Sequence, residues 1–399
     1  MHPSKDIIGS KGDELKGKKV CLCVCGSVAV MHSVELVREL MRRGAEVFCV
    51  MSPAAQELIK PDLLEWASGN KVVTKLTGEL EHIKLAAKVE GACDLILVAP
   101  ATANTISKAA LGIDDTAVTS VIATALGSQI PVIFAPAMHD SLQNPFVTEN
   151  LEKLKKMAGA EVIPPVISEG KRKMAGVSEM VDYAVRACSK KKSSLKGKKI
   201  LISAGATREF IDNVRFISNS ASGAFGIALA REAWLRGGEV TLVAGKLDRA
   251  VPSYLSSILA ESIEQMRSEL VSRARASDII LMSAAVGDFT TSKSPGKLDS
   301  SKKLTLELTP AKKILADIRS ANSRAFLVAF KAEEGTEGEI EKSAKELLAF
   351  SKSQMVIANH ASSTFAKDEA SILILTEKGA KENFFGSKQM LASKILDLI

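Results

Sequence analysis

An asparagine followed by small residues is the most distinctive chemical pattern in the C-terminal half of the sequence. Asn219 lies in "RFISNSASGAFG", where Ser220 to Gly223 carry small side chains or none. Small residues let the backbone approach a ligand closely, and a helix N-terminus binds phosphate with its free N–H groups. The pattern therefore predicts a phosphate site with an amide beside it. Asn219 also suits the N-cap of a helix predicted at 223–236, and the two roles are compatible.

Two loops of a similar kind follow predicted strands in the N-terminal half. The strand at 18–25 is followed by Gly26 and Ser27, and the strand at 46–51 is followed by Ser52. Backbone N–H groups and a serine hydroxyl are able to hold a phosphate, and Ser52 also suits a helix N-cap. An ordinary strand-to-helix turn explains either loop equally well when that loop is taken alone.

Two later strands of this half, at 94–99 and 131–135, run into the related segments "APATAN" and "APAMHDS". Ligands of parallel α/β sheets bind outside the carboxyl ends of the strands, so both segments are expected at one site. The residues of these segments that we expect at the site are Ala101, Thr102, Asn104, Met138 and His139.

The elements that must position these residues alternate between short apolar strands and helices. Continuous apolar runs of this length are typical of strands buried on both faces of a parallel sheet. The predicted strands lie at 18–25, 46–51, 94–99, 131–135, 199–203, 239–244, 279–284, 325–330, 355–358 and 371–376. The predicted helices lie at 33–43, 104–111, 116–126, 144–158, 179–188, 223–236, 262–276, 311–320, 338–350 and 387–398. The alternation predicts two three-layer α/β domains.

The two halves begin alike, with "LKGKKVCLCVCGS" at Leu15 and "LKGKKILISAGAT" at Leu195. Between them, the Ser- and Lys-rich run at 188–199 is typical of a linker. We therefore place the domain boundary near residue 190, which gives domains 1–190 and 191–399.

Composition limits the function classes. The 399 residues are 46% hydrophobic and 25% charged, with a net charge of +7, which suits anionic small molecules. Aromatic residues make up 4% and do not alternate with a basic block, so we expect no nucleic-acid partner. No apolar run reaches the roughly 18 residues of a membrane span, and the N-terminus has no signal-peptide core. These features predict a cytoplasmic protein.

Cys21, Cys23 and Cys25 alternate along one predicted strand, which places all three on one face. Zinc ribbons use C-x-x-C pairs in turns, and the sequence offers no second pair. We therefore favour buried thiols over a metal site.

The N-terminal motifs resemble those of the homo-oligomeric flavin-containing cysteine decarboxylases. The shared features are the Gly26–Ser27 loop, the "APATAN" and "PAM" segments, and His82, which lies twelve residues before Asp94. The resemblance implies a flavodoxin-like domain that binds FMN, with His82 as the base while the flavin takes a hydride equivalent. Without this pattern, a capped or surface histidine is the simpler interpretation of His82.

The sequence departs from the pattern of the bacterial decarboxylases at two points. His139 replaces an asparagine that grips the substrate carboxylate, and the resemblance to archaeal members implies that His139 does the same as a donor. The family flap corresponds to 168–180, which contains no cysteine to help reduce the intermediate. Lys171, Arg172 and Lys173 of this segment are able to clamp a phosphate or a carboxylate.

The C-terminal motif resembles the signature of phosphopantothenate–cysteine ligases. The resemblance implies a Rossmann-like domain in which Asn219 holds the acyl-nucleotide intermediate and bonds its carbonyl as charge develops. Lys297 is expected to reach the triphosphate, and Asp288 to bind the nucleotide or its Mg²⁺. The other residues that the resemblance implies for substrate and nucleotide binding are Arg208, Arg215, Gly223, Ala284, Ala285, Phe330 and Lys345.

The ligase resemblance also has departures. Asp299 stands where a second basic residue is usual, and His360 stands where an aspartate is usual. Asn359, Phe365 and Asp368 match the pattern.

The whole chain, about residues 15 to 398, resembles the bifunctional coenzyme A biosynthesis proteins, in which the decarboxylase and the ligase are fused. The resemblance implies 4'-phosphopantothenate, cysteine and CTP as substrates. It also implies flavoprotein trimers that ligase dimers join into a dodecamer.

Three alternatives stay open at this point. The flavoprotein half is either active or catalytically silent, because the flap lacks its cysteine and His139 replaces asparagine. A second alternative is a flavoprotein that serves as a regulatory binding subunit of another protein and has no catalytic role. The ligase motif argues against it, because a binding subunit does not need that chemistry. Generic flavodoxin-like electron transfer does not explain His82.

Overall fold

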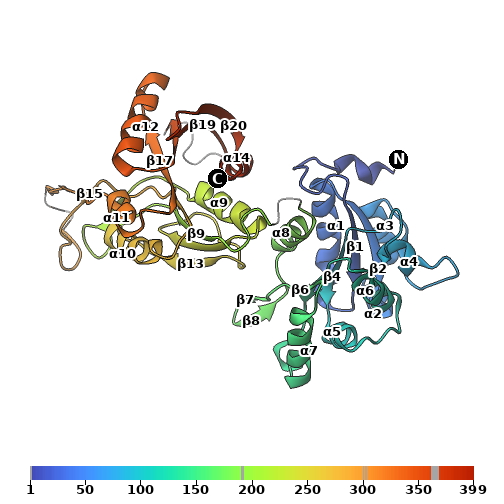
Figure 1. Ribbon diagram of the computed structural model, residues 1–399. Coiled ribbons are helices and arrows are strands. Elements are labelled where there is room, and N and C mark those ends of the chain that lie inside the picture. Colours follow the sequence, from blue (N-terminus) through green and yellow to red (C-terminus); the bar gives the residue numbers. More distant parts are fainter. Residues whose placement is uncertain (1, 190–192, 300, 302, 361–367) are drawn as a thin grey trace. The chain divides into compact units, whose positions relative to one another are not determined.

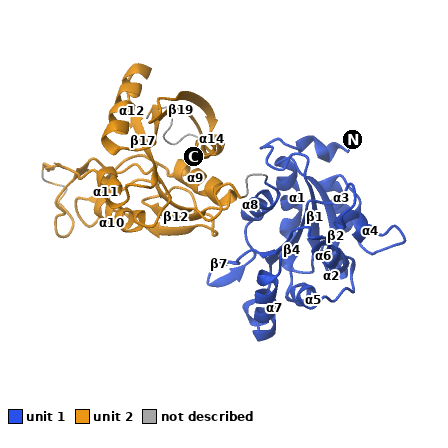
Figure 2. Ribbon diagram, in the orientation of Figure 1, with its two compact units in different colours: residues 1–192 blue, residues 193–399 orange. Residues whose placement is uncertain are grey.

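Parallel sheets form the centre of both units into which the chain divides, residues 1–192 and 193–399 (Figure 2). The structure, a computed structural model, describes residues 2–189, 193–299, 301, 303–360 and 368–399. The predicted linker therefore lies partly outside the described residues, and Phe365 lies wholly outside them.

The first unit contains a six-stranded parallel sheet with the order β3-β2-β1-β4-β5-β6 (Figure 1). Its strands are β1 (Lys19–Val24), β2 (Glu46–Met51), β3 (Val72–Val73), β4 (Leu95–Ala101), β5 (Val132–Pro136) and β6 (Ala160–Val162). Without the two-residue strand β3, the remaining order is the flavodoxin-like 2-1-3-4-5, which confirms the predicted fold class.

Helices connect the strands of this sheet. They are α1 (Ser33–Arg42), α2 (Pro53–Leu58), α3 (Pro61–Ser68), α4 (Glu81–Ala86), α5 (Ala103–Leu111), α6 (Ala117–Ser128), α7 (Pro145–Lys156) and α8 (Val177–Cys188). Short 3-10 helices lie at η1 (Pro3–Ile7), η2 (Val28–His32) and η3 (Asp140–Leu142), and an antiparallel hairpin consists of β7 (Val166–Ser168) and β8 (Lys171–Lys173). Ser52 is the N-cap of α2, as its position in the sequence suggested. The extent of α2 and the helices α3 and α4 were not predicted, because six to eight residues show too few turns of helical periodicity.

The second unit contains an eight-stranded sheet with the order β13-β12-β9-β14-β17-β18-β19-β20 (Figure 1). The strands are β9 (Lys199–Ala204), β12 (Glu239–Ala244), β13 (Ser256–Leu259), β14 (Ile279–Met282), β17 (Phe326–Glu333), β18 (Met355–His360), β19 (Glu369–Thr376) and β20 (Lys381–Ser387). The first six in this order are parallel and follow the Rossmann order 3-2-1-4-5-6, and an antiparallel pair completes the sheet.

The helices of the second unit are α9 (Ala224–Leu235), α10 (Ile263–Ala274), α11 (Ile314–Ala321), α12 (Glu337–Ser351) and α14 (Lys388–Asp397). Two small antiparallel ladders pair β10 (Arg208–Phe210) with β11 (Phe216–Ser218) and β15 (Phe289–Thr290) with β16 (Thr309–Pro310). Strands β13 and β20 were not predicted from the sequence. Both are edge strands with mostly exposed side chains, so neither contains a continuous apolar run.

The three alternating thiols, Cys21, Cys23 and Cys25, lie in the core of the first unit, as predicted. Cys21, Cys23 and Cys25 are at most 1% exposed and pack between the sheet and the helices. Burial raises the pKa of Cys25 to about 11 and that of Cys49 to about 12, so both thiols stay protonated at neutral pH. Within the described residues, His, Cys, Asp and Glu form no cluster of three or more that could hold a metal ion. In the same part of the chain, no helix combines the length and the apolar character needed to cross a membrane.

Candidate active sites

A cavity of about 650 Å³ lies at the carboxyl ends of β1, β2, β4 and β5. Seven of the residues predicted from the sequence line it, namely Gly26, Ser27, Ser52, Thr102, Asn104, Met138 and His139. Ala101 is fully buried at the end of β4, directly before the cavity loop. The topology explains the convergence, because parallel strands deliver their following loops to the same edge of the sheet.

Close packing of the loop after β1 against α2 shapes one wall of this cavity. A Cβ atom at Gly26 would lie 2.5 Å from the Cβ of Ala54, so only glycine fits where the loop after β1 meets the first turn of α2. The hydroxyl oxygens of Ser27 and Ser52 accept hydrogen bonds from the backbone N–H groups of Ala29 and Ala55, at 3.3 and 3.2 Å. Each hydroxyl proton is left to donate, which is what a phosphate oxygen requires.

The loop after β4 continues this lining. The Thr102 hydroxyl caps α5 by accepting from the N–H of Thr105 at 3.3 Å, and the two threonine hydroxyls lie 3.2 Å apart. Thr105 also donates to the Sγ of the buried Cys25 at 3.2 Å. Hydroxyl groups at the start of a nine-residue helix form a polar surface that suits an anionic ligand.

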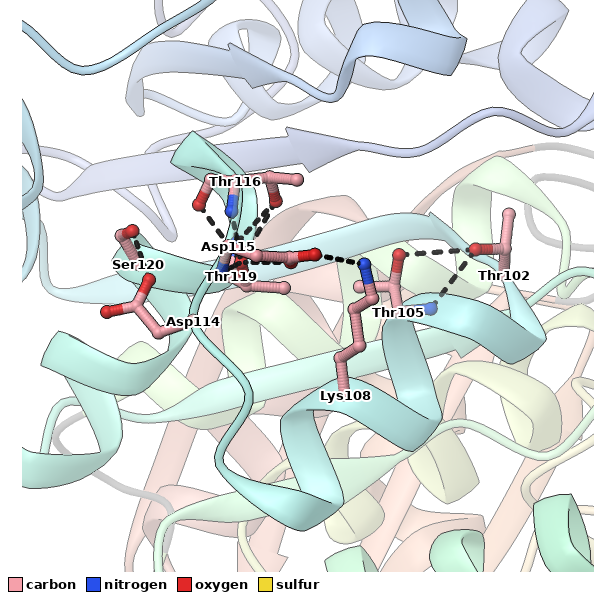
Figure 3. Close-up of polar contacts among 8 residues, drawn as sticks. All are labelled: Thr102, Thr105, Lys108, Asp114, Asp115, Thr116, Thr119 and Ser120. Carbon is pink, nitrogen blue, oxygen red and sulfur yellow. Dashed lines mark hydrogen bonds and ion pairs between the residues drawn. The ribbon is translucent and has the colours of Figure 1, made fainter.

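The same cavity contains a cation, Lys108, that was not predicted from the sequence. Figure 3 shows the side chain of Lys108 extending from α5 to Asp115, which directly precedes the N-cap of α6. The ion pair is 2.6 Å long and keeps the pKa of Asp115 below its usual value. Thr116 and Thr119 form a capping box beside it and also line the cavity. Because Lys108 is one turn past Asn104 on α5, helical spacing from the predicted loop is the signal that would have found it.

The loop after β5 brings a histidine to the rim of the cavity. His139 is exposed, and its Nδ1 accepts from the backbone N–H of Ser141 at 3.2 Å. The hairpin of β7 and β8 occupies the region predicted as a flap, and its Arg172 donates a hydrogen bond to Gln143. Gln143 follows the cavity residue Leu142, so the hairpin contacts a segment of the cavity rim.

His82 is the predicted residue of this unit that the structure places elsewhere. It lies on α4, which packs against α6, and it is not among the residues that line the cavity. Its Nδ1 atom is buried and has no hydrogen-bond partner among the described residues. Sequence spacing alone does not indicate which element α4 packs against.

The second unit has a cavity of about 670 Å³, which lies along the carboxyl ends of β9, β14, β17 and β18. Six predicted residues line it, namely Asn219, Gly223, Ala284, Ala285, Asp288 and Phe330. Gly223 has φ +76°, and a Cβ atom there would lie 2.1 Å from Cδ2 of Leu247. The run of small residues after Asn219 therefore lets this loop pack closely against its neighbours.

The amide of Asn219 is oriented by two backbone carbonyls. Its Nδ2 atom donates to the carbonyl oxygens of Ala285 and Val286, at 3.2 and 3.3 Å. An amide nitrogen has two N–H donors, so these two bonds use both of them, and Oδ1 is the atom that the two carbonyls leave as an acceptor. Donation from Asn219 to an acyl carbonyl requires one of the two bonds to break.

The lining of this cavity also includes an ion pair and aromatic rings. Asp288 pairs with Lys313 at 2.7 Å, and both side chains are more than 60% exposed. The rings of Phe225 and Phe330 meet edge to face, with their centroids 5.4 Å apart. Asn359 lines the same cavity, is 9% exposed, and has an Nδ2 atom without a hydrogen-bond partner among the described residues.

Four predicted basic residues do not line this cavity. Arg208 pairs with Glu261 at 3.1 Å, and Lys345 pairs with Glu341 at 2.7 Å on the surface of α12. Arg215 pairs with Asp212 at 3.1 Å, next to the segment that carries Lys297. Ion-pair partners decide where these three side chains lie. Lys297, the fourth, is exposed and is not among the residues that line the cavity.

Comparison with known families defines the class of both units. Residues 8–189 match the family described as Flavoprotein. Residues 195–399 match the family described as DNA/pantothenate metabolism flavoprotein C-terminal domain. The class is therefore a two-unit α/β flavoprotein.

Relatives that match over the full length of the chain identify a more specific family within this class. The Coenzyme A biosynthesis bifunctional protein CoaBC of Thermococcus kodakarensis is 42% identical, over 100% of this chain and 99% of the relative. The protein of that name from Methanocaldococcus jannaschii is 34% identical, over 100% of this chain and 97% of the relative. A solved C-terminal domain of a Coenzyme A biosynthesis bifunctional protein CoaBC has a TM-score of 0.45 at 28% identity, over 52% of this chain and 95% of that one.

The chain belongs to the family of coenzyme A biosynthesis bifunctional proteins. It is an enzyme of coenzyme A biosynthesis with ligase and decarboxylase activities.

Proposed function

We propose that the chain makes 4'-phosphopantetheine from 4'-phosphopantothenate and cysteine in two steps, one in each unit. The ligase unit forms an amide with CTP as the activating nucleotide, and the flavoprotein unit then removes carbon dioxide with FMN. One observation carries the proposal: in each unit, most of the motif residues line a single cavity at the carboxyl ends of the sheet.

The ligase step begins with activation of a carboxylate. The carboxylate of 4'-phosphopantothenate attacks the α-phosphorus of CTP, which gives an acyl nucleotide and releases pyrophosphate. The amine of cysteine then attacks the acyl carbon, forms the amide and releases the nucleoside monophosphate. The loop around Gly223 excludes water from this labile intermediate by packing closely, and Asn219 orients it. Phe330 provides an apolar face for the base.

Asp288 is the residue that we propose for Mg²⁺. A magnesium ion carried by a triphosphate needs one or two protein carboxylates and otherwise keeps phosphate and water ligands. Asp288 fits this requirement because its ion pair with Lys313 is exposed, and such pairs exchange at little cost. Lys313 is then available for a phosphate oxygen. Lys297 is the second lysine that we propose for the triphosphate.

The residues of the first cavity fit FMN. Gly26 leaves room that a Cβ atom would fill, and Ser27 and Ser52 offer hydroxyl protons to a phosphate. The Thr102 proton points to the Thr105 hydroxyl, because Thr105 donates its own proton to Cys25. When bound, FMN would supply the two-electron oxidation of the cysteinyl group that permits loss of carbon dioxide, and the same two electrons would then reduce the decarboxylated product.

Two histidines serve the decarboxylation. His139 at the cavity rim binds the substrate carboxylate as a donor, since its Nδ1 accepts from Ser141 and Nε2 is then the protonated nitrogen. His82 is the proposed base, and it lies outside this cavity within one chain. A second copy of the chain is the simplest source of a complete site.

Exposed apolar side chains support an oligomer. Val28 and Met31 follow the Gly26–Ser27 loop and are 83% and 71% exposed. Contact with a second copy of the chain would bury these apolar side chains. In the ligase unit, Val214 in the loop between β10 and β11 and Phe216 at the start of β11 are also exposed. We propose flavoprotein trimers that ligase dimers join into a dodecamer, located in the cytoplasm.

One assay tests the function. The purified chain is incubated with 4'-phosphopantothenate, cysteine, Mg²⁺ and either CTP or ATP, while pyrophosphate and carbon dioxide are followed together. Equal amounts of both products with CTP support the proposal. Pyrophosphate without carbon dioxide means a ligase with a silent flavoprotein unit, and activity with ATP alone contradicts the choice of nucleotide.

A further inference from the structure

A fully buried carboxylate occupies the loop between β10 and β11. The Asp212 side chain is 0% exposed, and both of its oxygens accept two hydrogen bonds. Oδ1 accepts from the backbone N–H groups of Val214 and Arg215, at 2.7 and 2.6 Å. Oδ2 accepts from the Arg215 guanidinium and from the backbone N–H of Leu298, both at 3.1 Å.

The last of these bonds reaches a segment more than 80 residues away in the sequence. Residues 294–298 make three further hydrogen bonds to the same loop. Ser294 N–H donates to the Ile211 carbonyl at 2.9 Å, and Asn213 N–H donates to the Gly296 carbonyl at 3.1 Å. Arg215 donates to the Leu298 carbonyl at 3.3 Å. The backbone is therefore held on both sides of Lys297.

The charge of Asp212 is what makes this connection possible. The backbone N–H of Arg215 contributes most to holding the pKa of Asp212 below its usual value, and those of Val214 and Leu298 add to the effect. An ionised carboxylate only accepts, so it satisfies four donors at once. An asparagine would present an NH₂ group to one donor pair and leave buried N–H groups unsatisfied.

We propose that Asp212 is a positioning residue of the ligase, which clamps the segment carrying Lys297 to the loop that leads to Asn219. The inference rests on the proposed function for the role of Lys297, but the clamp itself is a property of the fold. The clamp therefore fixes the position of the backbone that carries Lys297 relative to the loop that leads to Asn219. Asp212 touches neither ligand and acts through the backbone of its neighbours.

The clamp is tested without any substrate. Lys297 is exposed, so trypsin is expected to cut after it once the hydrogen bonds between residues 294–298 and the loop of Asp212 have broken. In Asp212→Asn we expect the initial rate of cleavage after Lys297 to rise about tenfold, with cleavage after the exposed Lys303 as an internal reference. Glu232→Gln is the matched control, because it removes another carboxylate paired with an arginine, at 2.9 Å, in the same unit. Unchanged cleavage after Lys297 in Asp212→Asn overturns the clamp, whether or not the ligase works.

Ligase kinetics test the positioning role. We expect Asp212→Asn to raise the KM for CTP about tenfold and to leave the KM for cysteine unchanged, while Asp212→Glu recovers part of the loss. Faster cleavage with an unchanged KM for CTP overturns the positioning role and points to an error in the role of Lys297. Equal increases of both KM values also overturn it, because they indicate a general structural defect.

A measurement on the unaltered chain covers the case in which Asp212→Asn does not fold. Hydrogen exchange is followed in peptides from 294–298 and from the exposed run 303–308. The clamp predicts slower exchange in 294–298, and equal exchange in the two peptides overturns it.

Discussion

Gly26→Ala tests whether the close approach of the loop after β1 to α2 forms the flavin site. The added Cβ atom would lie 2.5 Å from the Cβ and 3.0 Å from the carbonyl carbon of Ala54. Ordinary contacts begin near 3.4 Å, so the loop after β1 and the first turn of α2 must separate by about 0.9 Å (3.4 − 2.5). Overpacking of this kind costs about 1–3 kcal/mol. If binding must restore the native spacing, the affinity for FMN falls by about 5- to 150-fold.

The assay is a titration of the apoprotein with FMN, followed by quenching of flavin fluorescence. Ala54→Gly removes the atom that the new Cβ meets first, so the double variant is expected to recover part of the lost affinity. Recovery is incomplete, because the carbonyl carbon and oxygen of Ala54 stay within 3.2 Å. Ala54→Gly alone is the control for its effect on α2. Wild-type affinity in Gly26→Ala, or a double variant as weak as Gly26→Ala, refutes the steric argument.

Three further predictions concern other contacts. In Asn219→Asp, a carboxylate would face two carbonyl oxygens in place of an amide that donates to both, so we expect ligase kcat/KM to fall at least about 10-fold while FMN stays bound; full turnover contradicts this role. Lys108→Met removes a cation from the FMN cavity and is expected to weaken FMN more than riboflavin if Lys108 faces the phosphate; equal weakening of both flavins argues against that contact. Lys345, then Lys381, lower the pKa of Glu341 to about 2, so its contribution to stability is complete above about pH 4.5 and is lost as the pH falls through 2. Glu341→Gln is therefore expected to flatten the fall of the free energy of unfolding between these pH values in acid denaturation, and an unchanged slope contradicts the pairing.

The sequence predicts the parts of the fold in which apolar residues follow a regular pattern. The buried runs that became β1, β4, β9 and β14 are continuous and apolar, so their strands and their parallel arrangement follow from the sequence. The convergence of the Gly26 loop with the loops after β2, β4 and β5 follows as well, because it is a property of parallel sheets.

Side-chain partners were harder to predict, for a physical reason. The contact of Asp212 with Leu298 joins positions that only the folded sheet brings together, and no local period indicates it. The pair of Lys108 and Asp115 also crosses from one helix to the start of the next. By contrast, the pair of Glu341 and Lys345 has the i, i+4 spacing of helix neighbours, although the resemblance had assigned Lys345 to the nucleotide.

The two cavities use the same architecture for different electrostatic tasks. In the first, serine and threonine oxygens cap helices, so the lining is fixed and nearly neutral apart from Lys108 and its partner. Such a lining suits a cofactor that stays bound while electrons pass through it. In the second, Asp288 and Lys313 form an exposed pair that is worth at most about 1 kcal/mol, so each exchanges its partner readily. An exchangeable pair suits a nucleotide and its metal ion, which must enter and leave in every cycle.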